Sequence, residues 1–309
     1  MRIRRFTTTL VAGVLTIGLA GCTGAPDRED EARDIRDRVA AMPGVTDADL
    51  VYDNDVMAGT RFELRVDMDA ATDDQIGAVA DEMDHLRGDT FDDFDQRAEI
   101  NVARWTTLAG GDHLPDDAAR IAAQLRRLRA DVQAESIVYF AGTAGPSIKV
   151  NGATATGRVV DTVLQVFTDP PPDTVEVASE PASDDPYWAV RSRMSIADKQ
   201  RIDGQLAALA PAQPGYVTVR DGRIVTLTMS VTSPAAAHQE ISGAVRVLDA
   251  RPGRPVHLNW AAAGAAGARG PRWAGSAEIG GCDHGSHMGE LLPDAQALQQ
   301  RIRDEFGSC

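Results

Sequence analysis

The stretch Tyr216–Leu248 reads YVTVRDGRIVTLTMSVTSPAAAHQEISGAVRVL and predicts one complete structural unit. Two runs with the alternating pattern of strands, Tyr216–Arg220 and Ile224–Val231, flank the dipeptide Asp221-Gly222. That dipeptide is a strong short-range signal for a tight hairpin. The segment Ser233–Leu248 then has apolar residues at helical spacing. We therefore expect two antiparallel strands and a helix here.

The same pattern of strand pairs and helices is predicted along the whole chain. Another helix is expected to begin after Thr72, which suits an N-cap position. Periodicity predicts further helices at Ala32–Met42, Asp116–Val132, Ala153–Phe167, Ser195–Leu209 and Pro293–Phe306. Further strands are predicted at Asp49–Asp53, Thr60–Met68, Ile100–Leu108, Ser136–Ala141, Ser147–Val150, Thr174–Ala178, Tyr187–Met194, Pro255–Ala261 and Arg272–Ile279.

Helix–strand–strand units thus repeat at roughly 40 to 60 residues each. One unit cannot bury both its helix and its two strands alone, so neighbouring units must share sheets or pack helices. The predicted fold class is α+β, with repeated helix–strand–strand units forming antiparallel sheets covered by helices, as in ferredoxin-like lobes. The alternative is an accidental alternation of helices and strands. We expect an N-terminal lobe at 31–168 and a C-terminal lobe at 169–309.

The first 21 residues have the features of a processing signal. Arg2, Arg4 and Arg5 precede Phe6–Gly18, an uncharged run too short to span about 30 Å of hydrocarbon. A buried core helix, the alternative, would not need three arginines on one flank. The sequence that follows, Leu19-Ala20-Gly21-Cys22, resembles the lipobox of bacterial lipoproteins.

This resemblance implies that Cys22 becomes the first mature residue and carries acyl chains that insert into membrane lipid. Residues 22–30 would then be the lipidated cysteine and a polar linker. No second uncharged run of eighteen residues occurs. We therefore expect a soluble body on the extracytoplasmic face of the cell membrane, held there by lipid.

The charge balance excludes some partners. The whole chain has a net charge of −15, with 46 acidic and 31 basic residues. Because the predicted signal contains three arginines and no acid, the mature chain would have a net charge of −18. Such a surface repels nucleic acid phosphates and anionic headgroups, so nucleic acid is not an expected partner.

Two cysteines remain once Cys22 is acylated. In an oxidising compartment Cys282 and Cys309 are expected to form a disulfide that ties the last helix to the preceding strand. In the chain-entropy model such a bond contributes about 3 to 4 kcal/mol. A zinc or copper site in the loop from Cys282 to Met288, with ligands such as His284 and His287, is one alternative. Two free thiols are the other.

No residue pattern predicts catalysis, a metal ion or a cofactor. Ser286 has His284 two positions earlier, where a nucleophile elbow needs glycine. The chain has no His-Glu-x-x-His motif, and neither lysine follows a glycine as a phosphate loop requires. The four tryptophans fall inside predicted strands, which favours packing in the core or on a sheet face over a sugar-stacking platform.

The stretch Tyr216–Leu248 also resembles a BON domain, and AAMPGVTDADLVYDND at Ala40–Asp55 is similar to the helix exit of that family. Met229 stands where the family has a mid-strand glycine. The resemblance implies an envelope protein associated with membrane or polymer attachment, and it brings no catalytic residues.

We therefore expect a non-catalytic binding or scaffolding module that contacts envelope proteins or cell-wall material. A cell-wall-modifying hydrolase with a site assembled from scattered residues is one alternative. The other is a carrier of a metal or small ligand that uses the loop from Cys282 to Met288.

Overall fold

A computed structural model describes residues 26–55, 57, 59–181, 183–262, 273–282 and 290–308. In these ranges the helices are α1 (Glu29–Ala40), α2 (Asp73–Arg87), α3 (Ala118–Asp131), α4 (Thr156–Val166), α5 (Ile196–Ala207), α6 (Ala237–Leu248) and α7 (Pro293–Phe306). The strands are β1 (Asp47–Asp55), β2 (Gly59–Asp67), β3 (Asp95–Ala103), β4 (Thr106–Gly110), β5 (Ser136–Gly142), β6 (Gly145–Ala153), β7 (Thr174–Ser179), β8 (Tyr187–Val190), β9 (Gln213–Arg220), β10 (Arg223–Val231), β11 (Val256–Ala262) and β12 (Ala274–Ile279).

All twelve of these strands belong to one mixed sheet, and their order in the sheet follows their order in the chain. In the described part of the chain a helix followed by two strands occurs six times, and α7 follows the sixth unit. The two strands of each unit pair in antiparallel fashion, as β1 and β2 do. Strands of adjacent units, such as β2 and β3, pair in parallel because a helix carries the chain from one to the next. The protein is therefore α+β, but the expectation of purely antiparallel sheets is wrong where units join.

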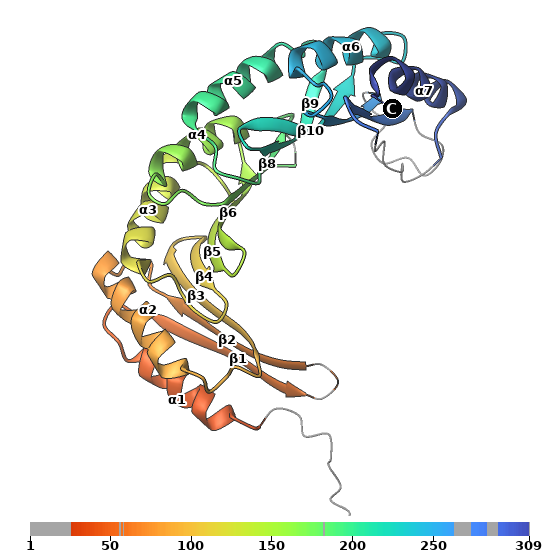
Figure 1. The fold of residues 1–309 in the computed structure, drawn as a ribbon. Helices are drawn as coiled ribbons and strands as arrows, with labels where there is room; N and C mark the ends of the chain where they lie inside the picture. The colour runs from red at the N-terminus through yellow and green to blue at the C-terminus, as the bar shows by residue number, and fades with distance from the viewer. Residues whose placement is uncertain are drawn as a thin grey trace, which may run out of the picture.

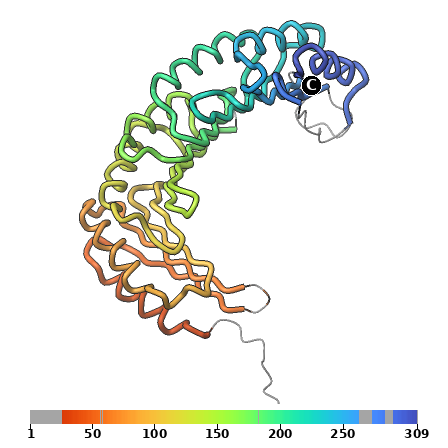
Figure 2. Tube along the Cα trace, viewed as in Figure 1, coloured from red at the N-terminus to blue at the C-terminus, as the bar shows by residue number. Residues whose placement is uncertain are grey.

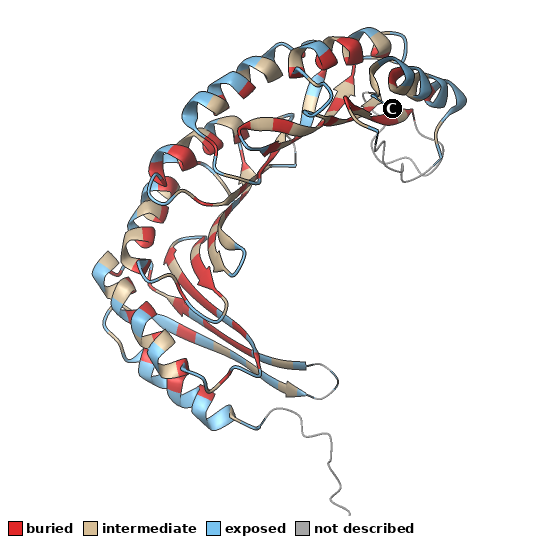
Figure 3. Ribbon diagram, viewed as in Figure 1, coloured by how far each residue is buried: buried red, intermediate tan, exposed pale blue. Residues whose placement is uncertain are grey.

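The sheet bends into an arch, with the helices along its convex outside and the strands along its concave inside (Figure 1, Figure 2). Helices add a layer on one face only, so the helix-covered side is longer and the sheet curves toward its uncovered face. Buried residues concentrate where strands and helices meet (Figure 3). They form a core cluster that runs from Ala32 in α1 to Ile302 in α7.

Two local sequence signals are confirmed. Asp221 and Gly222 connect β9 to β10 with φ of 51° and 67°, the positive values that a tight hairpin turn needs at both positions. At the start of α2, the Thr72 side chain accepts a hydrogen bond from the Gln75 backbone, and the Gln75 side chain accepts one from the Thr72 backbone. This capping box fixes where α2 begins.

One predicted element differs from the structure. The run Ile100–Leu108, expected to be a single strand, is interrupted by a two-residue turn at Arg104 and Trp105 and forms parts of β3 and β4. The turn contains none of the glycine, proline or asparagine residues that normally mark a turn. The sequence pattern therefore predicted one continuous strand here.

The predicted boundary at residue 168 falls between α4 and β7. Strands β6 and β7, on either side of it, are parallel neighbours in the sheet. The division into two lobes stays a prediction.

Helix α7 covers the last edge of the sheet. The backbone N–H of Ser276 in β12 donates to Gln299 Oε1 at 2.9 Å, and Arg303 Nε donates to the Ser276 carbonyl at 3.1 Å. Ile302 is fully buried in the core. Side chains of α7 thus occupy hydrogen-bonding groups that an edge strand would otherwise offer to another strand. None of the helices in the described residues has the length and apolar character needed to cross a bilayer.

Candidate binding face

The concave side of the sheet, here called the inner face, carries the side chains that alternate with the core. In β2, Phe62 and Leu64 point toward the helices and are fully buried, whereas Arg61 and Arg65 alternate with them and are exposed. Side chains of a strand alternate between the two faces, so each strand contributes residues to this surface. The helices of the described residues leave this face of the sheet uncovered (Figure 1).

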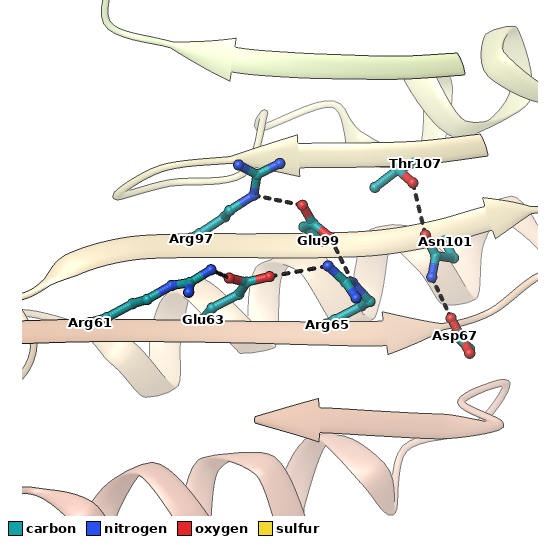
Figure 4. Close-up of polar contacts among 8 residues, drawn as sticks. All are labelled: Arg61, Glu63, Arg65, Asp67, Arg97, Glu99, Asn101 and Thr107. Carbon is teal, nitrogen blue, oxygen red and sulfur yellow. Dashed lines mark hydrogen bonds and ion pairs between the residues drawn. The ribbon is translucent and has the colours of Figure 1, made fainter. Parts of the chain in front are cut away.

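Five charged residues of β2 and β3 form a charge lattice on the inner face (Figure 4). Glu63 accepts hydrogen bonds from Arg61 and from Arg65, the latter at 3.1 Å. Glu99 accepts hydrogen bonds from Arg65 Nε at 2.7 Å and from Arg97 Nε at 2.6 Å. Although they lie on the inner face, Glu63 and Glu99 are only 5% and 6% exposed. The arginines therefore cover both carboxylates and hold them in place.

Strand register creates the charge lattice. The parallel pairing of β2 with β3 sets Glu63 beside Arg97 and Arg65 beside Glu99. Burial alone would raise the pKa of Glu99, but hydrogen bonds and charge from Arg65 and Arg97 outweigh it and hold that pKa below its ordinary value. Glu99 is thus ionised at neutral pH, and the charges on this part of the inner face are fixed.

Replacing Glu99 with glutamine is expected to lower the free energy of unfolding at pH 7 by about 2 kcal/mol, because it removes charge-assisted hydrogen bonds. A carboxyl whose pKa is lower in the folded state stabilises the fold above its unfolded pKa. That contribution is lost as the pH falls through the folded pKa. Urea unfolding at a series of pH values should therefore show the wild-type and variant curves converging below the ordinary value of 4.5.

The control is Asp81→Asn in α2, an exposed position that has no ion pair among the described residues. This variant should follow the wild type at every pH. A Glu99→Gln curve that stays parallel to the wild type down to pH 3 would show that the carboxylate is not stabilised by its ionised form.

A cavity of about 570 Å³ lies on the inner face beside the charge lattice and is lined by residues of β2, β3, β4 and β5. Asn101 joins two strands across it, because its side-chain amide donates to the Asp67 carboxylate and accepts from Thr107 Oγ1, the latter at 2.8 Å (Figure 4). Ser136 on β5 lines the same cavity. The lining therefore contains carboxylate, amide and hydroxyl groups held in fixed positions.

Trp105 also lines this cavity, and it is 64% exposed. The expectation that the tryptophans lie in the core or pack on the sheet is wrong for it, while Trp188, Trp260 and Trp273 are buried. Trp105 has a φ of 56°, a left-handed conformation that costs roughly 1 to 2 kcal/mol for a residue with a Cβ. Its carbonyl accepts a hydrogen bond from the Ile137 N–H at 3.0 Å, which ties the turn to β5.

Farther along the arch the inner face carries an aromatic pair next to the ion pair of Glu176 and Arg191. Tyr187 of β8 and Tyr216 of β9 stack with ring centroids 4.9 Å apart and an interplanar angle of 6°. Burial and a hydrogen bond with Glu176 raise the pKa of Tyr187 to about 12, so its hydroxyl stays protonated. On the neighbouring strands, Thr218 pairs with Thr226 in the register of β9 and β10. This part of the surface offers aromatic rings and neutral hydroxyls beside one ion pair.

Most residues assigned roles from the sequence lie outside the described residues, namely Cys22, Cys309 and the residues of the alternative metal site, His284, His287 and Met288. The disulfide between Cys282 and Cys309 therefore stays a prediction, as do lipidation of Cys22 and the absence of a catalytic site. Within the described ranges, no group of three or more His, Cys, Asp or Glu residues is placed to hold a metal ion.

Comparison with protein-family models, with curated proteins and with solved structures finds no match for this chain.

Proposed function

We propose that the chain is a non-catalytic binding or scaffolding module of the cell envelope, with the inner face as its contact surface. The observation that carries this proposal is the single sheet of repeated units, whose concave face the helices leave uncovered. Arches of this kind present extended surfaces that contact a partner at many points. Partly exposed polar and aromatic side chains along that face, such as Tyr187 and Thr218, suit a polar partner.

The proposed location follows from the N-terminal sequence. The arginine-rich start, the short uncharged run and the lipobox-like Leu19-Ala20-Gly21-Cys22 favour an acyl anchor on Cys22 and an extracytoplasmic body. The excess of acidic residues favours neighbours other than nucleic acid. Envelope proteins and cell-wall material are the partners that such an anchored arch would meet.

The C-terminal disulfide remains part of the proposal. The backbone N–H of Ser308 donates to the Gly281 carbonyl at 3.2 Å, and the N–H of Gly280 donates to the Phe306 carbonyl at 3.0 Å. These bonds bring the residues that precede Cys309 beside those that precede Cys282. The proximity supports a bond between the two cysteines.

We also retain BON-like or ferredoxin-like building blocks as a proposal. The stretch Tyr216–Leu248, which carries the BON resemblance, contains most of β9, all of β10 and all of α6. This order of two strands and a helix supports the idea that each block contributes one hairpin and one helix to the arch.

The proposal is tested on membranes from cells that express the full chain. The wild-type protein should incorporate labelled palmitate, sediment with membranes and retain isolated cell-wall fragments or cross-linked envelope proteins. Cys22→Ala should lose the label and the membrane. Thr218→Glu, on the inner face, should keep both but reduce retention of the partner about tenfold, which corresponds to about 1.4 kcal/mol.

The matched control is Arg127→Glu, which changes charge on an exposed position of α3 on the convex side. It should retain the partner as the wild type does. Equal loss in the two glutamate variants, or no retention by the wild type, contradicts a contact surface on the inner face. A wild-type chain recovered unlabelled from the cytosol contradicts the anchor.

A further inference from the structure

We infer that the cavity beside Trp105 binds a neutral saccharide unit. This inference deepens the proposed function and rests on it, because it gives the inner face a ligand class. The cavity, at about 570 Å³, has the size of a site for a small ligand or for one or two units of a polymer. Four features of its lining point to a sugar.

The first feature is the exposed indole of Trp105. A large apolar ring that is 64% exposed gains little from folding, and its left-handed backbone conformation disfavours any residue except glycine. Burial and backbone preference therefore do not account for tryptophan at this turn. An aromatic face carries a negative quadrupole that attracts groups with partial positive charge, such as the C–H groups on the flat side of a pyranose ring.

The second feature is the mixture of hydrogen-bonding groups next to the indole. Asp67 and Asn101 are held by their mutual hydrogen bond, and Thr107 and Ser136 add hydroxyl groups. A sugar hydroxyl both donates and accepts, so it needs donors and acceptors close together. The lining supplies carboxylate and amide acceptors together with amide and hydroxyl donors around one cavity.

The third feature is that two charged side chains in the lining have no hydrogen-bond or ion-pair partner among the described residues. Within the described part of the chain, neither the Arg104 side chain nor the Asp69 side chain has a hydrogen bond or ion pair, and both residues are exposed. In contrast, Arg65 and Glu99 in the same lining are bonded to each other. Arg104 is therefore available to donate to hydroxyl oxygens, and Asp69 is available to accept from hydroxyl groups.

The fourth feature is the charge balance of the lining, which argues against an anionic ligand. The lining holds the three carboxylates Asp67, Asp69 and Glu99 but only the two guanidinium groups Arg65 and Arg104. The net charge of −15 adds a repulsive background for phosphates and nucleotides. A neutral polyhydroxy ligand avoids this repulsion and still uses the hydrogen bonds.

The test is calorimetric titration of the full chain in detergent with chitotetraose, a neutral β-linked N-acetylglucosamine tetramer. The wild type should bind, and Trp105→Ala should weaken binding at least about tenfold. Trp105→Phe, which keeps an aromatic face, should remain within about threefold of the wild type. Asp69→Asn should weaken binding less than Trp105→Ala does.

Trp105→Gly guards against loss of folding as the cause. Glycine adopts a φ of 56° without strain, so this variant should keep or raise the thermal midpoint while losing the sugar. Thr226→Ala, on the inner face but outside the cavity, is the matched control and should bind normally.

The outcomes separate this inference from the proposed function. Chitotetraose that does not bind, or that binds equally to wild type and Trp105→Gly, overturns the saccharide site even if the anchored chain still retains wall fragments. Binding of a neutral tetrapeptide in place of the sugar at the same residues also overturns it. Failure of the proposed function instead appears as no retention of any envelope partner by the wild type, whatever the free sugar does.

Discussion

Replacing Asp84 with alanine is expected to lower the free energy of unfolding by about 3 to 5 kcal/mol, the usual cost of leaving a buried charge unpaired. Arg87, on the next turn of α2, is only 1% exposed. Its guanidinium donates to Asp84 and, through Nη1, to the Gly111 carbonyl at 2.9 Å. Asp84 also accepts the Leu114 N–H at 3.0 Å. The pair therefore fastens the end of α2 to the segment between β4 and α3.

Urea unfolding of three variants distinguishes a buried charge from simple loss of contacts. Arg87→Met removes the charge together with its hydrogen bonds and should cost less than Asp84→Ala. Adding Arg87→Met to Asp84→Ala should recover part of the lost stability, because no unpaired charge then remains. Asp81→Ala, an exposed position on the same helix, should change little. An Asp84→Ala variant as stable as Asp81→Ala would contradict this role for the ion pair.

The sequence carries the local signals of this fold. Asp221-Gly222 marks a hairpin, Thr72 marks a helix start, and the apolar spacing of α3 and α7 marks two of the helices, because each signal acts over a few residues. The joining of six hairpins into one sheet depends on packing between units. Nothing in a single hairpin shows which strand of the next unit will pair with it, so the continuous mixed sheet was not predicted.

The candidate site shows the same limit. Arg61, Glu63 and Arg65 alternate along β2 with a period of two, a pattern that on its own fits a solvated sheet face. In β3 the charges come in the complementary order, with Arg97 opposite Glu63 and Glu99 opposite Arg65. This match becomes visible only when the parallel register of β2 and β3 is known. The signal available in the sequence was this complementary order of charges in the two strands that flank α2, which could have indicated that they pair.

Trp105 could not be placed from the sequence because its turn lacks the residues that usually form one. Arg104 and Trp105 lie between apolar and β-branched residues that continue the strand pattern. Tryptophan disfavours the left-handed backbone conformation that Trp105 adopts. Backbone conformations that a residue disfavours concentrate at functional sites. The cavity beside it is therefore a feature that only the folded arrangement reveals.

Replacing Ile302 with aspartate is expected to detach α7 and to make the arch associate through its exposed edge. Ile302 is fully buried, and placing a carboxylate there should cost at least about 3 kcal/mol through lost packing and desolvation. Loss of α7 also removes the contacts of Gln299 and Arg303 with the backbone of Ser276. Strand β12 would then present unpaired backbone groups to a second copy.

Light scattering over a range of concentrations should show the Ile302→Asp variant as larger species, and hydrogen exchange should show faster exchange in β12. Arg301→Asp places the same side chain at an exposed neighbouring position and should leave both measurements unchanged.

The opposite edge of the sheet differs, because β1 carries Asp47, Asp49 and Asp53 and two such edges repel each other. A repeat array needs a cap where its last strand would otherwise accept another, and α7 meets that need at β12. If the variant stays monomeric although its β12 amides exchange rapidly, exposure of β12 does not cause association, and the role of α7 as a cap against association is contradicted.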